Sequence, residues 1–241
     1  MVAPNVITKS SGHTVQGGTS QTVNLPSGIV AGDLLVIFIH TISATLTRPD
    51  GWTSLASFSN DGTAYVWGRI ADGSEGASLS VGVSPTGRST AYGVYRYDGS
   101  VMGFDLSDCF AYSAVTRSRE GYTAALTLAD SAERSWGVCG WKGVSSDTIT
   151  SVPWTNDQVM TGNMGAVAYT AFMNLGTLDA EASSEDPGDF TTQYGAAHVV
   201  TFTWAVTGSG ATFTPASFGA EAGFQPGLAL SVPSDVTVYP M

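Results

Sequence analysis

The stretch VNLPSGIVAGDLLVIFIH, from Val23 to His40, decides the fold class. A short alternating segment ends at a Pro-Ser-Gly turn, and Ala-Gly-Asp then leads into six consecutive apolar residues, Leu34–Ile39. An apolar run of this length between turn residues is typical of a strand that is buried on both faces. The rest of the chain therefore has to supply a cover for each face.

The remaining periodic segments also have the character of strands. They are rich in Val, Tyr, Trp, Phe and Thr, and Gly, Pro, Asp or Asn separate them. Helical periodicity does not persist beyond two turns anywhere. The clearest of these segments are residues 63–70, 90–97, 122–129, 166–172 and 198–206. The sequence therefore predicts an all-β protein with antiparallel strands.

An internal repeat appears when the chain is shifted by 102 residues. Leu34–Ile39 then falls on Trp136–Trp141, Trp52 on Trp154, and Ala64–Ile70 on Ala166–Phe172, and small slips align residues 23–25 with 126–128 and the segment beginning at 91 with that beginning at 197. A lone sheet cannot hide its apolar face, so two such units should pack face to face or interleave strands. We expect a jelly-roll-like antiparallel β-sandwich built from two similar units about 102 residues apart.

The repeat divides the chain into three parts. Residues 1–20 form a polar leader or anchor, and residues 21–209 form the sandwich, with unit one at 21–100 and unit two at 122–209. Residues 210–241, interrupted by four prolines, form an extended C-terminal arm. The outer faces of the two central strands still carry apolar side chains, so a loop or a neighbouring subunit should lie over them.

Composition excludes several classes of function. Charged residues make up 12% of the chain, about half of the usual share, and the net charge is −11. An acidic chain repels phosphate backbones, which argues against a nucleic-acid partner. The longest apolar run has six residues, far too few to span a bilayer, so no membrane insertion is expected.

Aromatic residues are the candidates for ligand binding. Planar rings beside Asp and Asn can hold sugar rings, and the residues considered for this role are Trp52, Trp154, Tyr95 and Tyr97. Two other interpretations stay open for each ring, namely filling of the core and contact between subunits. The matching loop positions of Trp52 and Trp154 also suit structural plugs at the ends of the sandwich.

No catalytic or metal-binding residues are predicted. The acidic segment 179–189 is interpreted as a solvated loop rather than a calcium site, because it lacks the D-x-D-x-D-G pattern. The three histidines lie in unrelated segments, and the chain has neither G-x-S-x-G nor H-E-x-x-H. His40 should hydrogen-bond at a strand end, and Asp33 merely starts a strand. We expect no cofactor, no metal and no enzyme activity, although a distant carboxylate pair of a polysaccharide hydrolase stays an alternative.

The stretch 23–39, together with RPDGWTSL (48–55), YVWGRIADGSEG (65–76) and YGVYRYDG (92–99), resembles a β-sandwich family common in tailed bacteriophages and gene transfer agents. The resemblance covers residues 20–100 and, through the repeat, 20–206. It describes a scaffold and carries no site residues. The second unit departs from the pattern, since ERSWGVCGW (133–141) lacks the Gly-Asp that precedes the first central strand.

This resemblance implies a structural protein of the virion surface, of the tail-fibre, head-spike or decoration type. Its partners would be further copies of itself, a trimer if it is a fibre or spike, and other virion proteins, with a glycan of the host surface as a further ligand. It would be assembled in the host cytoplasm and located in the virion. The alternatives are a free, lectin-like carbohydrate-binding module and, ranked below it, a polysaccharide hydrolase.

Overall fold

The computed structural model describes the backbone of residues 5–14, 18–41, 44–59, 63–86, 88–99, 106, 110–117, 126–127, 134–142, 149–151, 155–163, 170–178, 184–185, 191–192 and 199–207. Side chains are described for residues 5–13, 18–41, 44–59, 63–86, 88–99, 106, 110 and 204–206.

The strands of the first half are β1 (Val6–Thr14), β2 (Ser20–Asn24), β3 (Leu34–Thr41), β4 (Thr45–Thr47), β5 (Thr53–Ser59), β6 (Thr63–Ile70), β7 (Ser78–Ser84) and β8 (Thr90–Tyr97). Those that follow are β9 (Phe110–Arg117), β10 (Leu126–Thr127), β11 (Arg134–Lys142), β12 (Ile149–Ser151), β13 (Thr155–Asn163), β14 (Thr170–Leu178), β15 (Ser184–Glu185), β16 (Thr191–Thr192) and β17 (Val199–Thr207). Among the described residues only Leu106 is α-helical, and Gly99 alone has a 3-10 conformation. The prediction of an all-β chain is confirmed.

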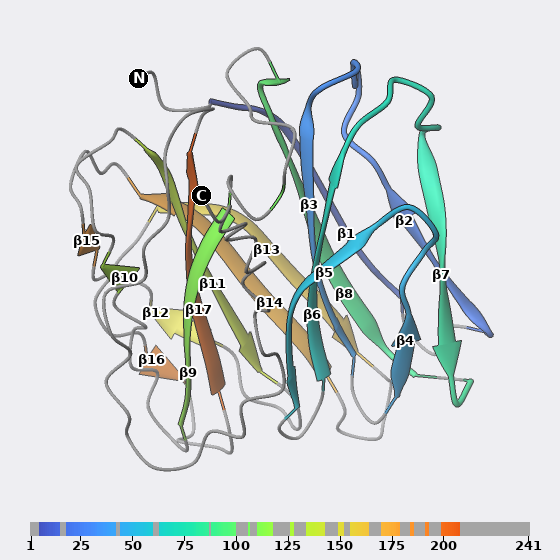
Figure 1. Cartoon of the computed structure of the whole chain (residues 1–241). Helices are drawn as coiled ribbons and strands as arrows, with labels where there is room; N and C mark the ends of the chain where they lie inside the picture. Colours follow the sequence, from blue (N-terminus) through green and yellow to red (C-terminus); the bar gives the residue numbers. More distant parts are fainter. Residues whose placement is uncertain are drawn as a thin grey trace, which may run out of the picture.

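The strands that the structure describes form two large sheets and three small ones (Figure 1). One five-stranded sheet has the order β1-β8-β3-β6-β5, and the other has the order β13-β14-β11-β17-β9. A three-stranded sheet, β2-β7-β4, lies beyond the first, and the pairs β10-β15 and β12-β16 complete the set. Every pairing is antiparallel, as the alternating segments predict.

The apolar run of the opening stretch is the middle strand of its sheet. Within β3, Leu34 lies opposite Ile70 of β6 on one side and opposite Tyr97 of β8 on the other. All eight residues of β3 are buried. A strand with a hydrogen-bonded neighbour on each side and no exposed face can be apolar throughout, which is why this run lacks the alternation of the other strands.

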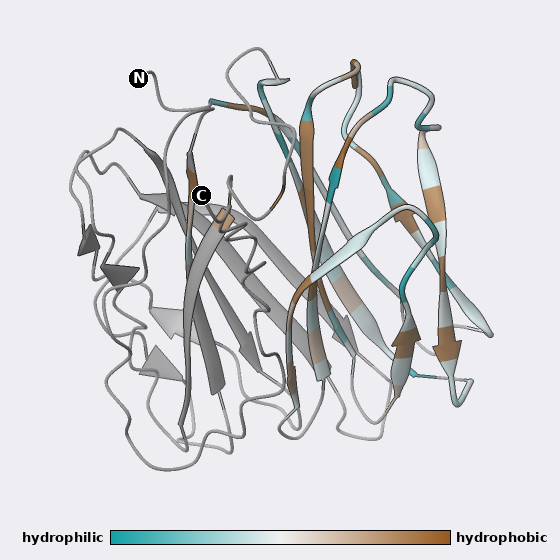
Figure 2. Ribbon diagram, viewed as in Figure 1, coloured by the Kyte–Doolittle hydropathy of each residue, from teal (hydrophilic) through white to brown (hydrophobic). Residues whose placement is uncertain are grey.

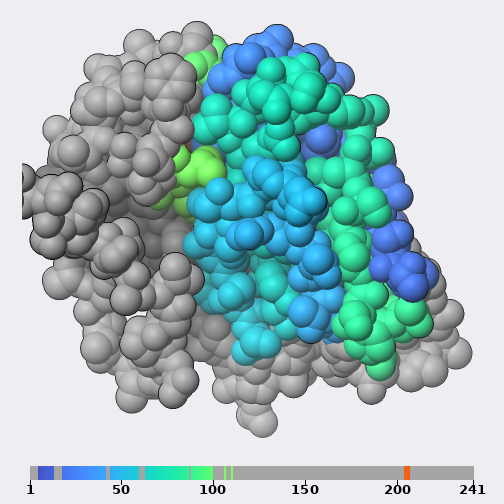
Figure 3. Space-filling view, turned by 45° about the vertical axis from the view of Figure 1, so that its right-hand side comes forward, coloured from blue at the N-terminus to red at the C-terminus, as the bar shows by residue number. Residues whose placement is uncertain are grey.

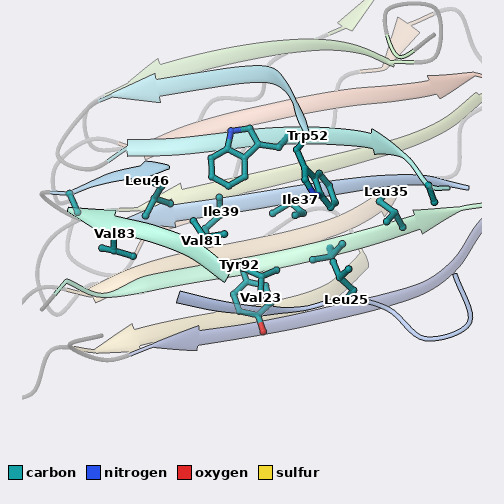
Figure 4. Packing of buried hydrophobic residues seen from close by; sticks show 14 residues of the cluster. Val23, Leu25, Leu35, Ile37, Ile39, Leu46, Trp52, Val81, Val83 and Tyr92 are labelled. Atoms are coloured by element: carbon teal, nitrogen blue, oxygen red, sulfur yellow. The ribbon is translucent and has the colours of Figure 1, made fainter. Parts of the chain in front are cut away.

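Successive side chains of β3 enter two different hydrophobic cores. Leu34, Val36 and Phe38 point into a core that is shared with the second five-stranded sheet. That sheet contributes Phe110, Trp204 and Val206 to the same core. Leu35, Ile37 and Ile39 point into a core beneath the three-stranded sheet (Figure 4). Figure 2 shows the same strand as a nearly continuous hydrophobic band between paler neighbours.

The cover for β3 therefore comes from the chain itself. The three-stranded sheet contributes Val23 from β2, Leu46 from β4, and Val81 and Val83 from β7 to one face. The second five-stranded sheet covers the other face. The expectation of a loop or a neighbouring subunit over β3 is corrected, because the short strands β2, β4 and β7 of the same chain assemble into a complete layer.

Pairings after residue 110 repeat the pattern of those before residue 100 when the two short strands β15 and β16 are together set against β7. The first half pairs β1 with β8, β2 with β7, β3 with both β6 and β8, β4 with β7, and β5 with β6. The later strands pair β9 with β17, β10 with β15, β11 with both β14 and β17, β12 with β16, and β13 with β14. With β15 and β16 counted as one, the two five-stranded sheets have the same strand order along the chain.

Some boundaries differ from the sequence predictions. Residues 6–14, placed in the leader, form β1 and pair with β8, and residues 110–117, placed between the units, form β9. Both strands carry mixed polar residues, so apolar periodicity does not mark them. The strand predicted at 166–172 runs from Thr170 to Leu178. The arm at 210–241 lies outside the described residues.

The described residues before position 100 form one continuous body in the space-filling view (Figure 3). Nowhere in the described ranges is there a helix with the length and apolar character that a membrane span requires.

Candidate functional site

Three of the four aromatic candidates lie in the cores. The relative exposure is 6% for Trp52, 0% for Tyr95 and 1% for Tyr97. Trp52 packs in the core beneath the three-stranded sheet, and the two tyrosines pack in the core between the five-stranded sheets. Trp154 lies outside the described residues. The rings of Trp52, Tyr95 and Tyr97 are thus covered by other side chains, and sugar stacking on them stays a prediction that would require the cores to open.

The two tyrosines belong to an aromatic cluster that joins the two five-stranded sheets. The ring centroid of Trp204 lies 4.4 Å from that of Phe38 and 5.7 Å from that of Tyr95. The indole N–H of Trp204 donates a 2.9 Å hydrogen bond to the Tyr97 hydroxyl. Buried aromatic pairs of this kind contribute about 0.5–1.5 kcal/mol beyond the area that they bury. The cluster holds the two sheets together.

A buried ion pair lies where the chain enters β3 and leaves β8. The side chain of Asp33 is 1% exposed, and its Oδ2 lies 2.5 Å from Nε of Arg96. The same carboxylate accepts hydrogen bonds from the backbone N–H of Val30 at 2.9 Å and from that of Gly99 at 3.1 Å. Nη1 of Arg96 donates to the carbonyl oxygen of Ser27 at 3.0 Å.

The sequence analysis does not predict this pair, since by local pattern Asp33 merely starts a strand. The signal that could have revealed it is Arg96 within YGVYRY, a charged residue in a strand that is otherwise apolar or small. A charge at such a position is almost never buried unless it is paired. The partner, 63 residues away in the chain, could be found only in the tertiary structure.

A second charged group stabilises the turn after β6. Arg69 contacts Asp72 at 2.6 Å and Glu75 at 3.0 Å, and the carboxylate of Glu75 accepts the backbone N–H groups of Asp72 and Gly73. The hydroxyl and backbone N–H of Ser74, and then the guanidinium of Arg69, hold the pKa of Asp72 below its usual value. Asp72 and Glu75 therefore stabilise the turn after β6.

His40 is buried in β3, with 3% of its surface exposed. Burial lowers the pKa of its imidazole to about 3, so the ring is neutral near pH 7. Its Nδ1 finds no hydrogen-bond partner in the described part of the structure. The expected strand-end hydrogen bond is therefore not made at Nδ1. His13 is an exposed residue of β1, and His198 lies outside the described residues.

Acidic, histidine and cysteine side chains do not gather into a metal-binding group of three or more within the residues that the structure describes. The polar groups that are brought together, Asp33 with Arg96 and Arg69 with Asp72 and Glu75, are engaged with backbone atoms or with each other.

Comparisons of the chain with protein-family models, with curated proteins and with solved structures found no match.

Proposed function

We propose that this chain is a structural protein of a phage-type virion surface, built from two jelly-roll-like units and working as a homo-oligomer. The observation that carries the proposal is the nested pairing of the first eight strands, β1 with β8, β2 with β7 and β3 with β6. Nested pairing over two facing sheets characterises jelly rolls, an architecture of viral capsid and lectin domains.

The matching pattern of pairings among the later strands supports a duplication. Each pairing in the first half has a counterpart after residue 110 when β15 and β16 together correspond to β7. The 102-residue repeat places the central strands β3 and β11 in correspondence, and each is the third strand of its five-stranded sheet. Duplicated sandwiches that share a core make a stiff, low-charge body, which suits a particle that must persist outside a cell.

The sheet edges support a closed assembly rather than an open-ended one. β1 and β5 are the edges of the first large sheet, and each has a register shift, between Val6 and Thr8 and between Ser54 and Ala56. Bulges and an edge lysine, here Lys9, are devices that disfavour strand addition by another chain. Copies of this protein would then meet through loops and faces, as in a trimeric spike or fibre.

Immunogold labelling of purified particles tests the location. Antibody raised against the full chain should label intact particles from the producing culture, and the chain should co-sediment with them. Light scattering during size exclusion should give a stable trimer or larger ring. Absence of the chain from purified particles would overturn the proposal, whatever the mass in solution.

A free lectin-like module is the second candidate, because jelly rolls are also lectin folds. It predicts a monomer that is missing from particles and binds glycans on an array. Since Trp52, Tyr95 and Tyr97 are buried, a sugar site would use other residues. Glycan binding by a particle-bound oligomer would instead add host attachment to the structural role.

A further inference from the structure

At the end of β8 the chain passes from its first half toward the strands of the second. The two residues that follow the strand are both fixed through their backbone N–H groups. Asp98 donates to the carbonyl oxygen of Asn5 at 3.0 Å, and Gly99 donates to Oδ1 of Asp33 at 3.1 Å. The departing chain is therefore attached both to the segment before β1 and to the loop before β3.

At Gly99 the two segments touch backbone to backbone. A Cβ atom added there would lie 2.5 Å from the backbone nitrogen of Asp33 and would also overlap Gly32. Real Cβ atoms do not approach backbone this closely, so only glycine fits while the hydrogen bond to Asp33 is kept. Gly32, on the other side of the contact, has φ +95°.

Arg96 and Tyr97 connect this contact to the rest of the molecule. They are consecutive in β8, so their side chains point to opposite faces of the sheet. Arg96 holds Asp33 and Ser27 on one face, and Tyr97 accepts the hydrogen bond of Trp204 on the other. Leu106 and Phe110, the next described residues after Gly99, also pack on the core that contains Tyr97.

We propose that Asp33, Arg96 and Gly99 form a junction latch, a conformational device that fixes the path by which the chain leaves the first half. By setting that path, the latch keeps the second five-stranded sheet seated on the core that holds Phe38 and Tyr97. This inference goes beyond the virion role and does not depend on it.

A buried ion pair is well suited to fixing the path of the chain after β8. The loop before β3 contains Gly28 at φ +71° and Gly32 at φ +95°, so it has little intrinsic preference for one conformation. A buried carboxylate requires its partners, because an unpaired charge in a core is strongly unfavourable. Asp33 satisfies this requirement only when Val30, Arg96 and Gly99 are all in place, which selects one arrangement of loop and exit.

The deciding experiment is hydrogen exchange on the full chain carrying Gly99→Ala. This variant keeps the Asp33–Arg96 pair but forces the exit away from the loop. We expect exchange in β9 and β17 to accelerate at least tenfold, while β2 and β7, which belong to the first half, change by less than threefold. Gly76→Ala is the matched control, since a Cβ there meets nothing closer than 3.7 Å, and it should leave all four strands unchanged.

Asp33→Asn is the second variant and removes the charge while keeping the size of the side chain. The same selective acceleration of β9 and β17 is expected. Unchanged exchange in Gly99→Ala would overturn the latch. Equal acceleration of all four strands, or complete unfolding of Gly99→Ala, would also overturn it, because the contact would then support the first half itself.

Discussion

The indole nitrogen of Trp204 donates a 2.9 Å hydrogen bond to the hydroxyl of Tyr97, a residue 107 positions earlier in the chain. Both side chains are almost fully buried, and the bond crosses the core between the two five-stranded sheets. Each partner would otherwise leave a polar atom in an apolar core, so the bond specifies how the second sheet meets β8.

Removing either partner should destabilise the protein. Tyr97→Phe leaves the Trp204 N–H without this acceptor, and Trp204→Phe removes the donor, so each change should lower the free energy of unfolding by about 1–3 kcal/mol. Urea denaturation measures both effects. In a double-variant cycle the coupling should be at least about 0.5 kcal/mol, and additive effects would show that the two groups do not interact.

Acid should weaken the protein through His40. The pKa of the buried ring is about 3, whereas the unfolded chain has the ordinary value of 6.5. Between these values the unfolded state binds more protons, so stability is complete above pH 6.5 and falls as the pH falls toward 3. From pH 6.5 to 5 the loss should be about 1.6 kcal/mol.

His40→Gln should flatten that part of the profile, because glutamine does not titrate. The comparison is made by urea denaturation at pH 5, 5.5, 6 and 6.5, above the range in which ordinary carboxyl groups titrate. Equal slopes for the two proteins in this window would mean that His40 is not the group responsible.

Turn glycines offer a test of backbone conformation. Gly73 has φ +84°, and a Cβ there would lie 3.2 Å from the backbone nitrogen of Ala31, so Gly73→Ala should cost about 1–2 kcal/mol. Gly76, three residues later, has neither constraint, and Gly76→Ala should change stability by less than about 0.5 kcal/mol. Thermal unfolding of the two variants side by side makes the measurement, and equal melting temperatures would contradict the strained turn.

Both faces of β3 should be sensitive to truncation. Ile37 points under the three-stranded sheet and Phe38 toward the second large sheet, and each is fully buried. Ile37→Ala should cost about 2–5 kcal/mol and Phe38→Ala about 3–5 kcal/mol. Val30→Ala, at a side chain with 55% exposure, is the control and should be nearly neutral. A small effect at Ile37 would mean that the three-stranded sheet does not cover β3 tightly.

Local pattern explains which elements could be predicted from the sequence. The strands at 63–70 and 90–97 have the bounds expected from their composition, and the apolar run at Leu34 is a central strand. β1, β4 and β7 were harder, because Ser, Thr and Gly dominate them and their apolar residues are few. Such strands are stabilised by the sheet that they join rather than by their own sequence.

The candidate site, in contrast, could not be predicted from local sequence pattern. Trp52, Tyr95 and Tyr97 were candidates because aromatic side chains suit both cores and sugar sites, and composition does not distinguish the two. The role of Asp33 could not be predicted, because its partner Arg96 lies in another strand. The burial of an aromatic ring or a carboxylate depends on residues far away in the chain, and local patterns do not carry that information.

The sequence by itself determined that this chain is all-β and that Leu34–Ile39 needs cover on both faces. Each of these follows from the order of neighbouring residues, since side chains alternate along a strand whatever it pairs with. Only the tertiary structure decided that a polar three-stranded sheet covers one face of β3, that a second large sheet covers the other, and that Asp33 meets Arg96 and Gly99. These depend on contacts between distant segments, which form only when all the layers are packed together.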